Sequence, residues 1–233
     1  QVFLLHTQFY IMILSYFKKF IFIHTLIFKK YSILRIMQIL EIRKLNLNGE
    51  ILDVGSKKSI SNVTNHLNTK KKINYADKFS KDPNDLTMDL EEVSEFKDKT
   101  FKNVLLFNVL EHVFNFKNCL KNCYLILDKN GFFFGSTPFF FHIHGSPNDY
   151  FRYTEQGLVK ALEETGFKHI KVQVICGGIF ICFFSSISTL TMRIPLLNNI
   201  LLIFCQILDS IILLFSKNFK SIFPLGYFFQ GNK

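Results

Sequence analysis

Two short stretches of the sequence carry residues suited to binding a nucleoside. Asp53-Val54-Gly55 ends one apolar run, and Asp77 ends the next, 22 residues after Gly55. A glycine at a strand end lets the backbone approach a ligand closely, and the N-terminus of a following helix offers unpaired N–H groups. A carboxylate about 20 residues further on is placed to bind ribose hydroxyls. The two stretches together predict a nucleoside pocket.

A second set of residues is suited to proton transfer. His112, in the dipeptide Glu111-His112, follows the apolar run 101–108, and His144 and Asp149 lie in the loop after the next run. Imidazole titrates near neutral pH, which suits a general base. We expect His112 or His144 to accept a proton from a reacting molecule, with Asp149 close by.

These residues also have structural interpretations. Glu111-His112 would cap the junction between a strand and a helix, and Asp149 would form an ion pair with Arg152. A metal site is a further alternative, which we do not expect, and it would use His142, His144 and Asp149.

The elements that must position these residues alternate between strand and helix. Apolar runs predict strands at 50–54, 72–76, 101–108, 132–137, 167–175 and 227–231, with a short strand at 86–88. Amphipathic spacing predicts helices at 59–68, 115–127 and 155–165. This alternation indicates an α/β fold with a Rossmann-like, doubly wound, mainly parallel sheet, in which ligands bind beyond the carboxyl ends of the strands.

The charge and hydropathy of the chain divide it into four parts. The net charge of +10 is concentrated in 1–48 and 174–233, whereas the middle is nearly neutral. We therefore expect a hydrophobic, basic, helical N-terminal extension, a catalytic core, a hydrophobic helical insertion and a closing strand, at 1–48, 49–175, 176–223 and 224–233. Basic residues among Phe, Ile and Leu suit an anionic lipid surface better than a nucleic acid.

The insertion has three interpretations that the sequence leaves open. Stretches 172–192 and 194–208 carry no charge, and strands on both sides require the chain to leave and return on one side of the sheet. A helical hairpin that turns near 193–199 satisfies this requirement. It would lie on a membrane, span it, or pack as an extra layer on the N-terminal helix. Peripheral membrane association is the expectation, with an integral hairpin as the alternative.

The five cysteines are Cys119, Cys123, Cys176, Cys182 and Cys205. Their number is odd and no spacing matches a zinc site, so we expect buried thiols in a reducing, cytoplasmic environment.

Several segments resemble one family in order and spacing. ILDVG, YADKF, MDL, FKNVLLFNVLEHV and LDKNGFFFGSTPF resemble the class I S-adenosylmethionine-dependent methyltransferases of the type 11 group. The loop HGSPNDYFRYTEQGL, with the following ETGF, resembles a subgroup associated with cell-surface polysaccharide or lipid biosynthesis. The resemblance covers 49–175 and resumes at PLGYFFQGNK.

The resemblance implies S-adenosylmethionine as the cofactor. Asp53 and Gly55 would form the floor under its methionine part, and Asp77 would bind the ribose hydroxyls. Asp89 and Leu90 would flank the adenine. Neighbouring positions and the end of run 101–108 complete the expected cofactor contacts: Val54, Ser56, Lys78, Asn108 and Val109. Asp89 has an alternative role as a cap for a helix at 91–96.

The implied activity is methyl transfer to a small or lipid-linked acceptor, at oxygen. The sequence FNVLEH replaces the Asn/Asp-Pro-Pro-aromatic motif of enzymes that methylate bases or glutamine, so no nucleic-acid substrate is expected. Two positions depart from the family pattern: Lys57 replaces the second glycine of the turn, and Lys102 replaces an aspartate after Phe101. They motivate the alternative of a catalytically degenerate binding or scaffold protein at the membrane.

Overall fold

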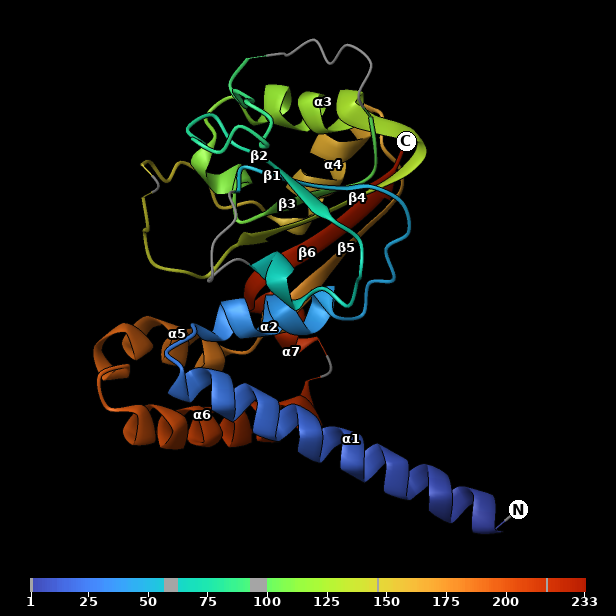
Figure 1. The fold of residues 1–233 in the computed structure, drawn as a ribbon. Coiled ribbons are helices and arrows are strands. Elements are labelled where there is room, and N and C mark those ends of the chain that lie inside the picture. The colour runs from blue at the N-terminus through green and yellow to red at the C-terminus, as the bar shows by residue number, and fades with distance from the viewer. Residues whose placement is uncertain (1, 57–62, 93–99, 146, 217) are drawn as a thin grey trace.

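The computed structural model describes residues 2–56, 63–92, 100–145, 147–216 and 218–233. A six-stranded sheet forms its centre, with helices on both faces and a further layer of long helices beyond one face (Figure 1).

The sheet has the strand order β2-β1-β3-β4-β6-β5. Strands β1 to β4 are parallel, and β6 is antiparallel to both of its neighbours. The strands are β1 Ile51–Val54, β2 Ile73–Ala76, β3 Phe101–Phe107, β4 Leu127–Pro138, β5 Lys168–Gly177 and β6 Pro224–Asn232. The order reverses at β1, so the crevice at its carboxyl end is where such sheets bind ligands. The predicted doubly wound, mainly parallel sheet is confirmed.

Helices cover both faces of the sheet and explain the apolar runs. Helices α3 (Phe116–Ile126) and α4 (Glu155–Thr165) pack on one face, and α2 (Ile33–Ile42) packs on the other. All four residues of β1 are buried as a result. A strand covered on both sides must be apolar nearly throughout, which is why these strands could be recognised without alternation.

Helix α4 has the bounds that the sequence predicts. Thr154 caps it by accepting a hydrogen bond from the Gly157 amide at 3.2 Å, and Gly166 ends it in the left-handed region with φ +108°. Both signals act locally, so they were readable from the sequence.

Two predicted elements differ from the structure. The strand predicted at 86–88 is a single bridge between Ala76 and Leu86. Of the helix predicted at 59–68, the described part is the 3-10 turn η1 (Val63–His66).

Strand β4 begins at Leu127, five residues before the predicted start. Asn-Gly is a common turn signal, but the Asn130-Gly131 pair lies inside the strand, where Asn130 adopts φ +61°. The pairing register with β3 shifts at this level, so the local irregularity bends the strand without ending it.

The N-terminal extension forms two helices, α1 (Val2–Phe28) and α2. Lys30 adopts φ +63° at the break, and Ser32 caps α2 by accepting a hydrogen bond from the Arg35 amide at 3.3 Å. The N-terminal extension is therefore helical, as predicted, with a break between α1 and α2.

The insertion before the last strand forms a helical hairpin. Helices α5 (Ile179–Thr191) and α6 (Pro195–Phe215) pack against each other, and the short α7 (Phe219–Ile222) leads into β6. Helix α6 also contacts α1, so the two flanks of the chain form one helical layer (Figure 1). The hairpin therefore does pack on the N-terminal helix.

Three polar side chains of α6 face other protein groups. Asn198 accepts a hydrogen bond from Thr191 at 2.6 Å, and the Asn199 side-chain oxygen lies 2.6 Å from His24 Nδ1 on α1. Asp209 is buried, and its carboxylate accepts the amide hydrogens of residues 180 and 181 at 3.1 and 2.8 Å. This carboxylate caps α5, whose own N-cap position is a glycine.

Asp209→Ala should lower the free energy of unfolding by about 2 kcal/mol, because two N–H groups at the start of α5 lose a charged acceptor. Urea unfolding of the purified chain measures this change. Ser210→Ala is the matched control on the exposed side of α6, and it should stay within about 0.5 kcal/mol of the parent. Equal losses in the two variants would contradict the capping role.

Candidate functional site

The carboxyl ends of β1 and β2 meet directly. The Gly55 amide donates a hydrogen bond to the Ala76 carbonyl at 2.7 Å, and the Ser56 amide lies 3.4 Å from the same oxygen. Gly55 adopts φ +71°, a conformation that favours glycine. Asp77 follows Ala76 and is half-buried, so the two predicted halves of the nucleoside pocket lie side by side.

Asp53 is buried near the end of β1 and binds the segment that contains η1. Its carboxylate accepts a hydrogen bond from the Thr64 hydroxyl at 2.9 Å, which ties η1 to the strand. Burial, and then the nearby Asp53 charge, raise the pKa of Tyr75 on the adjacent strand. The sequence did not reveal Thr64 as a partner, since only a folded chain brings the turn back to β1.

The loop after β2 brings together Lys78 and Asp89, two of the predicted cofactor residues. Asp77 accepts the Phe79 amide hydrogen at 2.7 Å and forms a local turn. Lys78 Nζ lies 2.5 Å from Asp89 Oδ2, and this hydrogen bond lowers the pKa of Asp89. Leu90 packs against the core beside them.

The cap role of Asp89 is partly visible. Its Oδ1 accepts the Glu91 amide hydrogen at 3.0 Å, as a capping residue would. Residues 93–96 of the helix that it would cap lie outside the described residues, and so does Lys57.

The end of β3 packs against both β1 and the N-terminal extension. Val109 lies over Gly55 so closely that a Cβ on the glycine would come within 2.6 Å of Val109 Cγ1. Asn108, at φ +54°, donates a hydrogen bond to Gln38 of α2 at 3.3 Å, and Gln38 in turn donates to Ser136 at 3.1 Å. This buried amide network was not predicted, and it fixes α2 to the functional edge of the sheet.

Lys102 lies away from this edge. It is the second residue of β3, at the amino end, and its Nζ donates a hydrogen bond to the Asn130 carbonyl at 2.8 Å. The departure from the family pattern at Lys102 therefore lies at the end of β3 opposite the nucleoside side of the sheet.

A buried carboxylate joins the two predicted histidines. Glu111 is fully buried, and its Oε1 lies 3.8 Å from Nε2 of both His112 and His144. The two imidazole rings stand 4.9 Å apart. Burial raises the pKa of Glu111 to about 8. The sequence offered the two histidines as alternative bases and gave Glu111 only a capping role.

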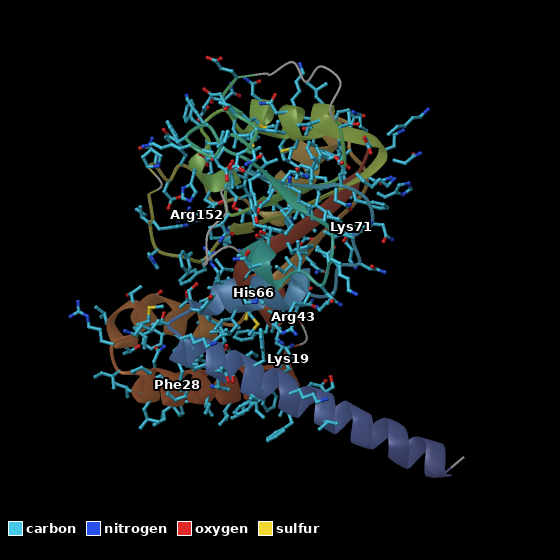
Figure 2. All side chains as sticks on the ribbon, viewed as in Figure 1. Lys19, Phe28, Arg43, His66, Lys71 and Arg152 are labelled. Carbon is cyan, nitrogen blue, oxygen red and sulfur yellow. The ribbon has the colours of Figure 1, made fainter. Side chains whose placement is uncertain are left out.

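Asp149 organises the loop that carries His144. Arg152, labelled in Figure 2, donates to both oxygens of Asp149 at 2.5 and 2.7 Å, and this pairing holds the pKa of that carboxyl well below its usual range. Asp149 also accepts the His144 amide hydrogen at 2.9 Å, and the backbone amide of Tyr150 donates to the Glu111 carbonyl at 2.8 Å. The ion pair with Arg152 is present, and it positions His144.

One group of metal-ligand side chains occurs within the described residues. It consists of Glu111, His112 and His144, whose ligand atoms all lie within 4.8 Å of one another. It shares only His144 with the alternative site of His142, His144 and Asp149 considered from the sequence.

Comparison with known proteins identifies the type of fold. Residues 48–135 match the family model Methyltransf_11, described as a methyltransferase domain. The sheet order and the packed helices agree with this match. The chain has the class I methyltransferase fold. None of the curated proteins matches the sequence.

Solved structures with this methyltransferase fold are distant in sequence. A SAM-dependent methyltransferase of Archaeoglobus fulgidus is 14% identical, with a TM-score of 0.53 over 85% of this chain and 94% of the other. Phosphoethanolamine N-methyltransferase 2 of Haemonchus contortus, solved with phosphomonomethylethanolamine and S-adenosylhomocysteine, is 16% identical, with a TM-score of 0.52 over 84% of this chain. This chain spans about half of that enzyme, 52% of its length.

The methyltransferase fold alone does not decide the reaction. The [4+2]-cyclase SpnF also matches, at 10% identity and a TM-score of 0.50 over 84% of this chain and 78% of the other. The family model covers the β1 turn, Asp77 and Glu111-His112, but it ends before His144 and Asp149. The assignment of the His144 loop to a subgroup stays a prediction.

Gly55→Ala should lower the free energy of unfolding by at least about 1 kcal/mol, because alanine disfavours a positive φ and its Cβ would collide with Val109. Urea or thermal unfolding tests this. Gly157→Ala, in the first turn of α4, is the control and should be neutral or slightly stabilising. A Gly55 variant as stable as the parent would show that the turn tolerates a side chain.

Proposed function

We propose that the chain is an S-adenosylmethionine-dependent methyltransferase. The observation that carries this proposal is the Gly55–Ala76 hydrogen bond, which sets Asp77 beside the β1 turn at the edge where such sheets bind nucleotides. The match to a methyltransferase domain supports it, as do the distant relatives solved with this cofactor or its product.

The residues present at this edge suit the cofactor. Gly55 leaves room for a close approach, and Asp77 offers a carboxylate to the ribose hydroxyls. Asp53, with Val54 and Ser56, would lie under the methionine part. The other expected contacts are Lys78 next to Asp77, Asp89 and Leu90 beside the adenine, and Asn108 and Val109 at the end of β3.

The cofactor supplies an electrophilic methyl group, so the protein must chiefly align the acceptor and manage its proton. Glu111 and His112, which follow β3, form a polar cluster with His144 of the loop after β4. An acceptor hydroxyl must lose its proton as it is methylated, and this cluster is suited to take it. Asp149 would act indirectly, by holding the His144 loop through Arg152. O-methylation is therefore the proposed reaction.

The helical layer supports a membrane location on the cytoplasmic side. Helix α6 is long and apolar enough to cross a membrane by composition, yet its polar residues Asn198, Asn199 and Asp209 are buried against protein. Its outward face is mostly apolar and exposed, from Phe204 (58%) to Phe215 (86%). A helix polar toward the protein and apolar toward the outside suits a lipid surface rather than water.

Basic residues border this apolar face. Lys18 and Lys19 are exposed on α1, Lys29 and Lys30 follow its end, and Arg193 is exposed at the hairpin turn. Lys19 and Phe28, labelled in Figure 2, mark α1 in this layer. Such residues are attracted to anionic lipid headgroups. We therefore place the enzyme peripherally on a membrane, acting on a small or lipid-linked acceptor in cell-surface polysaccharide or lipid metabolism.

Asp77→Ala should weaken binding of S-adenosylhomocysteine by about 10- to 100-fold, because hydrogen bonds from the ribose to a charged acceptor are lost. Isothermal calorimetry measures the affinity. Asp82→Ala, an exposed acid in the same loop, is the control and should bind as the parent does. Unchanged affinity in the Asp77 variant would remove the ribose assignment, and no binding by the folded parent would favour the degenerate alternative.

Vesicle flotation tests the membrane surface. The parent should float with vesicles that contain an anionic phospholipid, and the double variant Phe204→Glu, Ile211→Glu should bind at least about tenfold more weakly, since each apolar side chain contributes about 1.5–3 kcal/mol when it leaves water. Leu125→Glu, on exposed α3 surface beyond the opposite face of the sheet, should bind normally. Equal binding by all three proteins would contradict the assigned surface, and retention on membranes after carbonate extraction would favour the integral hairpin.

A further inference from the structure

We propose that Glu111, His112 and His144 bind one divalent transition-metal ion, with zinc as the simplest case. Two imidazoles and one carboxylate form a ligand set that proteins use for zinc and for ferrous iron when coordination positions must stay open. The two histidine Nε2 atoms each lie 3.8 Å from Glu111 Oε1.

Hydrogen bonds at the far side of each ring point the ligand atoms inward. His112 Nδ1 lies 2.6 Å from the Asn148 carbonyl oxygen, so Nδ1 carries the proton and Nε2 keeps its lone pair. His144 Nδ1 lies 3.2 Å from the His142 carbonyl and 3.4 Å from Asp149 Oδ2, which has the same effect. Metal-binding histidines are held by carbonyl or carboxylate partners in this way.

Glu111 is the strongest sign that something is bound there. Its Oε1 is buried and has no hydrogen-bond partner among the residues that the structure describes, whereas Oε2 accepts a long bond of 3.4 Å from Thr137. A buried carboxylate oxygen without a partner is costly, and here it faces two further acceptor atoms. Three lone pairs that converge without a donor require a cation between them or a proton on one of them.

The spacing of the atoms suits an ion after a small adjustment. Metal bonds of 2.0–2.2 Å set neighbouring ligand atoms about 3–3.5 Å apart. The three ligand atoms lie within 4.8 Å of one another, so the two rings must together close by about 1–2 Å. The side chains of His112 and His144 are 11% and 30% exposed, so they can turn, whereas Glu111 is fixed by burial. The exposed side leaves positions for water or an acceptor oxygen.

The ion would also explain how the acceptor loses its proton. An oxygen bound to a divalent cation is more acidic, so its proton would pass to solvent while the oxygen attacks the methyl group. With the ion bound, the two histidines would act as ligands and would no longer accept the proton themselves. This consequence rests on the proposed methyltransferase function, but metal binding does not.

Titration of the tag-free chain with Co²⁺, without any S-adenosylmethionine, tests the proposal. The parent should bind one equivalent with a visible ligand-field absorption that Zn²⁺ abolishes by competition. Glu111→Gln and His144→Ala should each weaken binding by about 100-fold or more, because loss of a direct ligand should exceed the 10- to 100-fold cost of losing a supporting partner. Unfolding curves show whether each variant is folded.

His142→Ala is the matched control, because it removes an exposed imidazole from the same loop while keeping the carbonyl that supports His144. It should bind Co²⁺ within about twofold of the parent. The proposal is wrong if the parent binds no stoichiometric ion, if folded Glu111→Gln retains full affinity, or if His142→Ala and His144→Ala lose affinity equally. A chain that binds the ion but not S-adenosylhomocysteine would overturn the methyltransferase proposal alone.

Discussion

The structure depends on covering both faces of a mainly parallel sheet. The strands β1 and β3 are apolar nearly throughout, so each face needs its own helical layer. Helices α3 and α4 supply one layer from within the core. The other is supplied by the flanking segments, where α2 and α5 pack on the sheet, α1 packs on α2, and α6 packs on α5 and α1. The flanks are therefore part of the fold, and they are rich in apolar residues because they cover one face of the sheet.

This coverage also shapes the functional edge. Because α2 lies across the carboxyl ends of β3 and β4, its buried Gln38 joins Asn108 and Ser136, and so ties the extension to the strand ends beside the β1 turn. A substitution in α2 that displaces Gln38 would therefore disturb the strand ends at the nucleoside side of the sheet. The loop with His144 covers the same edge and is held by the Asp149–Arg152 pair, so both coverings are fixed by buried or half-buried polar bonds.

The sequence predicted the features that local signals control. Buried strands, the caps of α4, and the adjacency of Asp77 to the β1 turn follow from short patterns and from the rule that parallel strands end at one edge. The partners of Asn108 and Glu111 did not follow, because Gln38 is 70 residues from Asn108 and His144 is 33 residues from Glu111 along the chain. Such contacts depend on how layers and loops dock, which no local pattern encodes. The start of β4 at Leu127 was not predicted because Asn-Gly signals a turn, whereas here the pair lies within the strand at an irregularity of its pairing with β3.

The polar groups of the outer layer are compatible with the proposed lipid surface, as its apolar side chains are. In water, a helix such as α6 would gain by turning Asn198, Asn199 and Asp209 outward and its phenylalanines inward. Instead Asp209 caps α5, Asn199 meets His24, and the apolar side chains remain exposed. The inward bonds hold α5, α6 and α1 together through contacts that do not weaken in lipid, where backbone and side-chain polar groups must find partners within the protein. The layer is thus built so that its cohesion does not depend on water at its outer face.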